Sequence, residues 1–315
     1  MNKIYFCQLF LFLYALIFLS CEKKIDIKTN DGFEKLVVEG HIEAGLPPYV
    51  VLTKSQPYFS NFNVQELSNL FVHNAFVTVS NSSDTVVLNE ISSDTIPPLL
   101  LKIISGQLGI NLASKNDPQG IKVSIYTTLD SKMFGQIGET YNVKIITNNQ
   151  ELSATTSIPK AAKIDSLWTV PHPSNDTLST VFIRYSDPGD ESNFIRYFTS
   201  TNGQPFFPPY FQSVLDDKSI FDVNGKTFDF PIEKGQYRNK KIDFDTFTYF
   251  TKGDSIVVRW CAVDQAHFDF WNTAEFDRGS MGNPFTSPVT IKSNIKGGLG
   301  IWGGYSPSYY VLKIE

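Results

Sequence analysis

The stretch GETYNVKIITNNQELSATTSI, residues 138–158, decides the fold class of this chain. Runs of strand-forming residues lie on both sides of the pair Asn148-Asn149. Asparagine tolerates the left-handed backbone conformation that a tight two-residue turn requires. The stretch therefore predicts an antiparallel hairpin.

Similar runs precede this hairpin. KLVVEGHIE and YVVLTKS flank the turn-forming GLPP, and NAFVTVSNSSDTVVLNEI reads as two strands around a Ser-Asp turn. With GIKVSIYTT they form a series of short strands without amphipathic helices between them. The series predicts an immunoglobulin-like antiparallel β-sandwich over residues 34–160. Residues 92–118, which contain Pro97-Pro98, are expected to form an irregular insertion.

Residues 161–315 predict a second β-rich domain with one helix. TFTYFTKGDSIVVRWCAV reads as two strands around Lys252-Gly253-Asp254. The helix is expected over about 264–277, with Asp264 as its N-cap. Its apolar residues recur at helical spacing; they are Ala266, Phe270 and Ala274. The chain as a whole is thus expected to be mainly β.

The N-terminus has the pattern of an export signal. Lys3 precedes an apolar run from Ile4 to Leu19, which is shorter than the about 20 residues of a membrane span. Leu19-Ser20-Cys21 then resembles a bacterial lipobox, in which the cysteine sulfur receives a diacylglycerol group. We expect residues 1–20 to be a signal peptide and Cys21 to be the lipidated N-terminus. An uncleaved anchor and an ordinary signal peptide remain the alternatives.

The charged segment after Cys21 is expected to be a solvated tether over residues 21–33. Two or more acyl chains give stable attachment to a membrane, so the folded part would stay close to its membrane. Cys7 is lost with the signal and Cys21 is consumed by the lipid, which leaves Cys261 without a partner for a disulfide. The apolar run SIVVRWCAV around Cys261 predicts that it is a buried small hydrophobe.

The charge distribution excludes one class of partner. The formal net charge is −5, and no basic stripe is present, so nucleic acid is not an expected partner. The chain contains 26 Phe and 14 Tyr, which favour strands. No cofactor-binding motif is recognised. The glycines of IKGGLGIWGGY, residues 295–305, lack the Lys of a phosphate loop and are expected to serve tight turns or close strand packing.

An aromatic stretch, GQPFFPPYFQ at residues 203–212, is the candidate contact site. Its rings stand among prolines that stiffen the chain; they are Phe206, Phe207, Tyr210 and Phe211. If exposed, they would form an apolar patch able to stack on a sugar or dock a protein. If buried, they would cover the core. Both interpretations stay open.

Two other candidate sites have weaker support in the sequence. Asp187, Asp190 and Glu191 lie in one acidic turn, which suits either calcium or ordinary turn chemistry. The four histidines show no metal-binding pair; they are His41, His73, His172 and His267. No Gly-x-Ser-x-Gly motif occurs, although a Ser-His-Asp triad assembled only in space stays open. We therefore expect neither a metal site nor an enzyme.

Several scattered motifs resemble one known family. They are KLVVEGHIEAGLPPYVVLTKSQPY, NAFVTVS, GETYNVKI, ATTSIPK, SDPGDESNFIRY and DFWNTAEFDRGSMGNPFTSPVTIKSNIKGGLGIWGGY. In this order they resemble the Bacteroidota lipoproteins of the domain of unknown function 4249, over nearly all of the chain after Cys21. The resemblance implies an envelope lipoprotein, and members are often encoded beside TonB-dependent receptors.

These observations favour a non-enzymatic binding or accessory lipoprotein of the outer membrane, on its periplasmic or outer face. The expected partners are the membrane, through the lipid, and a TonB-dependent receptor, which the resemblance alone implies. Two alternatives remain. One is a structural or adhesive surface protein in which the β domain is a spacer, and the other is a hydrolase with a spatially assembled site.

Overall fold

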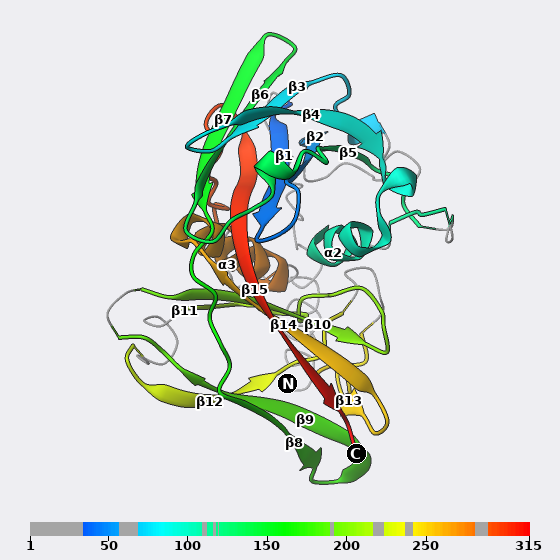
Figure 1. Ribbon diagram of the computed structural model, residues 1–315. Coiled ribbons are helices and arrows are strands. Elements are labelled where there is room, and N and C mark those ends of the chain that lie inside the picture. Colours follow the sequence, from blue (N-terminus) through cyan, green and yellow to red (C-terminus); the bar gives the residue numbers. More distant parts are fainter. Residues whose placement is uncertain are drawn as a thin grey trace, which may run out of the picture. The chain divides into compact units, whose positions relative to one another are not determined.

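The last strand, β15 (Leu299–Lys313), joins distant parts of the chain in the computed structural model (Figure 1). It pairs in parallel with β1 (Leu36–Glu43) and antiparallel with β14 (Ser255–Val263). One large sheet therefore contains strands from both sides of residue 160. The predicted boundary itself falls in the connection between β7 (Gln150–Ser157) and β8 (Ser166–His172).

The structure describes most of the chain after the N-terminal segment: residues 34–56, 69–108, 112–115, 118, 120–189, 192–216, 224–236, 242–280 and 289–315. The predicted signal peptide, Cys21 and the tether lie outside the described residues. Glu34–Glu315 forms one compact unit. The remaining elements, in chain order, are β2 (Tyr49–Lys54), β3 (Phe76–Ser80), β4 (Thr85–Ser92), η2 (Ser93–Thr95), α2 (Pro98–Leu108), β5 (Ser124–Thr127), η3 (Ser131–Met133), β6 (Thr140–Thr147), β9 (Asn175–Ser186), β10 (Phe194–Thr201), β11 (Val214–Asp216), β12 (Thr227–Ile232), β13 (Phe250–Thr251) and α3 (Gln265–Ser280).

The protein is mainly β, as predicted. An 11-stranded mixed sheet has the order β11-β10-β14-β15-β1-β2-β5-β4-β3-β6-β7. A 4-stranded sheet has the order β12-β9-β13, with β8 also paired to β9. The pairs among β1 to β7 are all antiparallel. These strands follow one path within the large sheet, and the immunoglobulin-like sandwich stays a prediction.

The hairpin predicted at residues 138–158 is confirmed. β6 and β7 pair antiparallel from Thr140↔Ser157 to Thr147↔Gln150. Asn148 and Asn149 have φ values of 48° and 61°, so both turn residues adopt the left-handed conformation. Along β6, exposed and buried residues alternate strictly, as expected for a strand with one face in the core.

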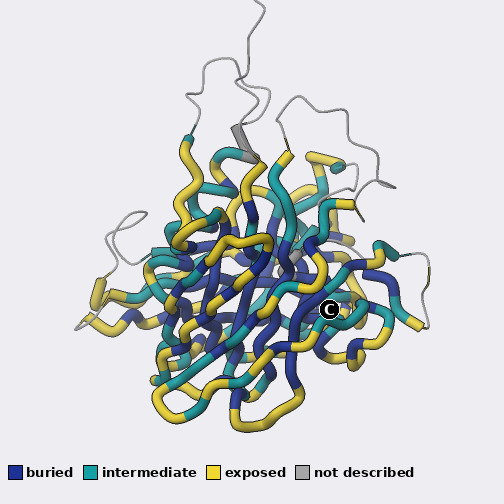
Figure 2. The backbone as a smooth tube through the Cα atoms, turned by 90° about the horizontal axis from the view of Figure 1, so that it is seen from above, coloured by how far each residue is buried: buried dark blue, intermediate teal, exposed yellow. Residues whose placement is uncertain are grey.

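The glycine-rich stretch lets β15 pack closely against other strands, as predicted. A Cβ on Gly304 would lie 2.4 Å from the backbone oxygen of Ser157, at the end of β7. Trp302 is fully buried, and its indole nitrogen donates to the backbone oxygen of Tyr141 at 3.0 Å. β6 and β7 are thus the last two strands in the order of the large sheet, and they also pack against β15, which lies in the middle of that order. Buried segments run through the interior of the unit, while the connections at its edge are exposed (Figure 2).

Helix α3 confirms the predicted helix and its N-cap. Oδ1 of Asp264 accepts the backbone N–H of His267 at 2.8 Å, which satisfies one free donor of the first turn. The other carboxylate oxygen accepts the Thr156 hydroxyl at 2.5 Å and the Ser157 N–H at 3.2 Å. The Asp264 side chain therefore caps the helix and also links it to β7 through two hydrogen bonds.

The prediction of an irregular insertion at 92–118, and of a single helix in the chain, is wrong. Residues 98–108 form α2, which begins at Pro98. Proline is favoured in the first helical turn because its missing N–H has no partner there in any case. Leu100, Ile103 and Ile104 are the buried face of this helix. The run PLLLKIISGQL is apolar on most sides, so its helical period is weak.

No helix among the described residues has the length and apolarity needed to cross a membrane.

Candidate functional site

The predicted contact stretch divides into a buried and an accessible half. Phe206 and Phe207 are buried, whereas Tyr210 is half-buried and Phe211 is 44% exposed. Phe207 exchanges two backbone hydrogen bonds of 3.0 Å with Thr199 of β10, which fixes the stretch at the sheet. The four residues therefore do not form one surface.

Tyr210 and Phe211 are joined instead by two rings from a later segment. We call Tyr210, Phe211, Phe244 and Phe247 the aromatic surface. Ring centroids lie 5.0 Å apart for Tyr210 and Phe211, 5.7 Å for Phe211 and Phe247, and 5.6 Å for Phe244 and Phe247. These contacts are edge-to-face, which is a favourable geometry for aromatic pairs. Phe244 is 65% exposed.

A polar residue shapes the turn that presents the two later rings. Asp243 accepts the backbone N–H of Asp245 at 3.1 Å and the hydroxyl of Thr246 at 2.9 Å through its carboxylate. Its backbone oxygen accepts the N–H of Phe247 at 2.9 Å. This turn shortens the strand that the sequence predicts from TFTYF onward to β13 (Phe250–Thr251), because the Asp243 side chain competes for the local backbone donors.

Gln236 connects the two halves of the aromatic surface. Its backbone N–H donates to the oxygen of Pro208 at 3.0 Å. Its side-chain Nε2 donates to the backbone oxygen of Phe247 at 2.8 Å. The rings are therefore held by hydrogen-bonded loops, so little conformational entropy would be lost when a partner contacts them.

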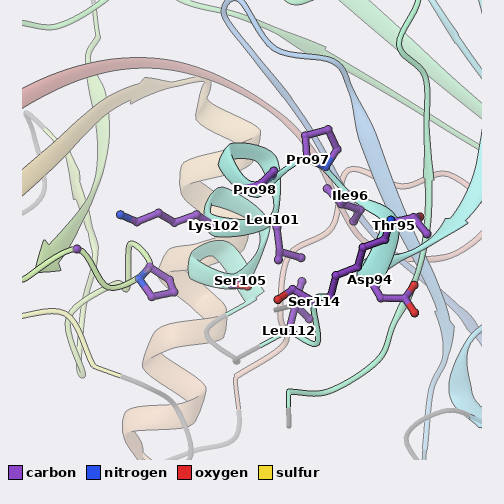
Figure 3. A pocket seen from close by; sticks show the side chains of 13 residues that line it. Asp94, Thr95, Ile96, Pro97, Pro98, Leu101, Lys102, Ser105, Leu112 and Ser114 are labelled. Atoms are coloured by element: carbon purple, nitrogen blue, oxygen red, sulfur yellow. The ribbon is translucent and has the colours of Figure 1, made fainter. Parts of the chain in front are cut away.

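A cavity of about 500 Å³ lies beside α2, and we call it the α2 cavity (Figure 3). The helix contributes Leu101, Lys102 and Ser105 to its lining. Gly106 brings α2 against the segment that leads to the aromatic surface, since a Cβ there would lie 1.6 Å from the backbone oxygen of Phe206. Volumes of this size are typical of small-molecule sites.

A third cluster is polar but fully enclosed. Arg196 donates to the hydroxyl of Tyr305 at 2.6 Å and to that of Ser213 at 3.1 Å, and its Nη2 lies 3.7 Å from Glu275. The Cζ atom of Arg196 is 3.5 Å from the ring centroid of Trp271. These arginine and glutamate side chains are buried, so the ion pair must be compensated internally. We assign this cluster to the joining of α3 and the sheet.

The described histidines occupy three settings. His41 and His267 are buried with ring centroids 5.6 Å apart, and burial lowers the pKa of both well below the usual value. His172 contacts Tyr249 edge-on at 4.8 Å. His73 lies 2.5 Å from the carboxylate of Glu90.

The surroundings of Glu90 are the arrangement nearest to a hydrolase triad that we find in the described part of the chain. Glu90 accepts hydrogen bonds from Ser124 and from the backbone N–H of Asn74, and these lower its pKa. His73 and Ser124 both contact the same Glu90 oxygen. In a triad the serine donates to the imidazole. Here the serine donates to the carboxylate, so the order of the three groups differs from that of a triad.

The acidic turn proposed for calcium is described only in part. Asp187 is buried, and it accepts the backbone N–H of Gly225 at 3.2 Å. Burial raises its pKa. Asp190 and Glu191 lie outside the described residues. Cys261 is fully buried, as predicted, and burial raises its pKa to about 12.

Sequence reasoning missed Phe244 and Phe247. Their spacing of three, after an aspartate in DFDTFTY, is typical of an Asp-initiated turn with two rings on one side. The pattern is also compatible with a strand, and its aromatic content favours that interpretation. Only the contact with Tyr210 and Phe211 identifies these rings as part of one surface.

Together these features define a mainly β protein with an exposed aromatic surface and a cavity beside a short helix. The chain belongs to the family of the domain of unknown function DUF4249, whose family model matches residues 22–310. No curated protein matches the chain.

Proposed function

We propose that this protein is a lipid-anchored, non-enzymatic binding or accessory component of the bacterial outer membrane. Its anchor would be Cys21, at the end of the apolar run and lipobox-like Leu19-Ser20-Cys21. The short charged segment that follows would confine the folded part to a thin layer at the membrane. Confinement raises the effective concentration of any partner in that layer, so a modest interface suffices.

The aromatic surface is the observation that carries this proposal. Phe211 and Phe244 are 44% and 65% exposed, and they belong to one cluster of four rings. Aromatic residues are enriched at the centres of protein interfaces because they bury much area at low entropic cost. We propose that the cluster contacts a membrane-embedded partner.

The partner we propose is a TonB-dependent receptor, and this part rests on the resemblance to Bacteroidota lipoproteins. The immunoglobulin-like arrangement of residues 34–160 likewise stays part of the proposal, while the aromatic surface belongs to residues 161–315.

The test is co-purification of the full-length lipoprotein, from the membranes of its own host, with TonB-dependent receptors. The double variant Phe211→Ser/Phe244→Ser should lose most of the co-purified receptor and keep the thermal unfolding midpoint of the wild type. Phe76→Ser is the matched control, because Phe76 is 53% exposed on β3 and lies outside the aromatic surface. Equal recovery of receptor with the double variant would place docking elsewhere, and absence of any receptor with the wild type would refute the partner.

A further inference from the structure

Among the described residues, the Lys102 ammonium group of the α2 cavity has no acidic partner. No carboxylate in the described ranges forms an ion pair with Lys102, whose Nζ lies 5.4 Å from the centroid of the Phe206 ring. The side chain is half-buried, and burial lowers its pKa. A partly desolvated cation gains most from a charge-assisted hydrogen bond to an anion.

The acidic group in the lining is already neutralised. Asp94 forms an ion pair with Lys122, at 3.0 Å between Oδ2 and Nζ. In Figure 3, Lys102 and Asp94 lie on opposite sides of α2. A second lysine, Lys115, also lines the cavity. The cavity is therefore electropositive, and its cationic end at Lys102 is distinct from the end at Asp94.

Much of the lining between these ends is apolar. It includes Ile96, Leu101 and Leu112, together with Pro97 and Pro205. Leu112 is buried and Leu101 is half-buried. This wall offers hydrophobic contact to the non-polar part of a ligand.

We propose that the α2 cavity binds a monoanionic amphiphile, with the anionic group at Lys102 and the apolar chain against Ile96, Leu101 and Leu112. The chemical class is a medium-chain carboxylate or the anionic headgroup region of a lipid. The site is separate from the aromatic surface, so it does not depend on the docking role proposed above.

The probe is octanoate labelled with ¹³C at the carboxyl carbon, titrated into the full chain in zwitterionic nanodiscs and observed by NMR. Empty nanodiscs measure partition into lipid. The protein should shift the carboxyl resonance saturably, and Lys102→Gln should weaken binding by about tenfold, as expected for one lost charge-assisted bond. Lys102→Arg should retain binding, and Lys132→Gln, at an exposed lysine outside the cavity, should bind like the wild type.

Unlabelled octanol, added as a competitor of equal chain length, separates charge recognition from simple apolar burial. Octanol should displace the labelled octanoate about tenfold less effectively than unlabelled octanoate does. Equal displacement, or equal binding by Lys102→Gln, would overturn the proposal. Displacement by dihexanoylphosphatidylglycerol would assign the ligand to phospholipid, whereas failure of displacement would assign it to a free carboxylate; both outcomes support an anion site.

Discussion

Arg259 of β14 donates a hydrogen bond to Glu43 of β1, a residue 216 positions earlier in the chain. Both side chains are buried. The hydroxyl of Tyr309, on the intervening strand β15, donates to the other Glu43 oxygen at 3.0 Å. These contacts thus link β1, β15 and β14, three neighbouring strands that come from the first and the last parts of the described chain.

Arg259→Met should lower the free energy of unfolding by roughly 3–5 kcal/mol, because it leaves Glu43 as a buried charge without its cation. Chemical denaturation with a reversible two-state fit would measure this loss. The matched control is Arg184→Met, which breaks the exposed pair of Arg184 and Asp229. Exposed pairs contribute about 0–1 kcal/mol, so similar losses for the two variants would contradict the role given to the buried pair.

Stability should fall as the solution is acidified below about pH 6.5, the usual histidine pKa. Burial, aided by Arg196 and Arg259, lowers the folded-state pKa of His41 and His267 well below that value. Below pH 6.5 the unfolded chain therefore binds protons that the folded chain does not. Each histidine then removes up to about 1.4 kcal/mol per pH unit, and the stabilisation is fully present only above pH 6.5.

The measurement is the free energy of unfolding between pH 7.5 and pH 5, a range above the usual titration of Asp and Glu. His41→Phe should reduce the slope by about half, since one of the two titrating groups is removed. His172→Gln is the control, because His172 lies on β8 and is only half-buried. A slope that is unchanged in His41→Phe would show that other groups govern the acid sensitivity.

Truncation of Phe207 should lower the free energy of unfolding strongly, whereas truncation of Phe244 should leave it nearly unchanged. Phe207→Ala removes a ring that is 2% exposed and should cost about 3–5 kcal/mol of unfolding free energy. Phe244→Ala removes a ring that is 65% exposed and should change stability by no more than about 0.5 kcal/mol. Thermal and urea unfolding of both variants would check this. A large loss for Phe244→Ala would mean that the aromatic surface serves the fold instead of a partner.

Cys21→Ser should abolish lipidation of the protein. Serine has no thiol for the diacylglycerol thioether, so neither lipidation nor the cleavage that follows it would occur. Fractionation and intact-mass measurement of both proteins would check the prediction. Wild-type protein should carry the added mass of its acyl chains on a mature N-terminus at Cys21. Wild-type protein that carries no acyl mass and retains residues 1–20 would favour the simple anchor.

Local chemistry made part of the fold predictable. The turn of Asn148-Asn149 and the cap at Asp264 depend on the side chains of a few neighbouring residues, and both are found where the sequence predicts them. α2 was missed because its run is nearly all apolar and its opening prolines are also typical of loops. Tertiary burial of Leu100 and Ile104 decides in favour of the helix.

The candidate sites were less predictable, and the reason is distance along the chain. Phe211 and Phe244 come from separate loops and both contact Phe247. Lys102 lies over the Phe206 ring because Gly106 allows α2 to approach that segment closely. The sequence by itself determined the mainly β class, the hairpin at 138–158, the capped helix and the burial of Cys261, because strand period, turn chemistry and apolar content act locally. Only the tertiary structure decided which aromatic rings are exposed, which charges are buried together and where a cavity remains, because those depend on long-range packing between strands that no local pattern specifies.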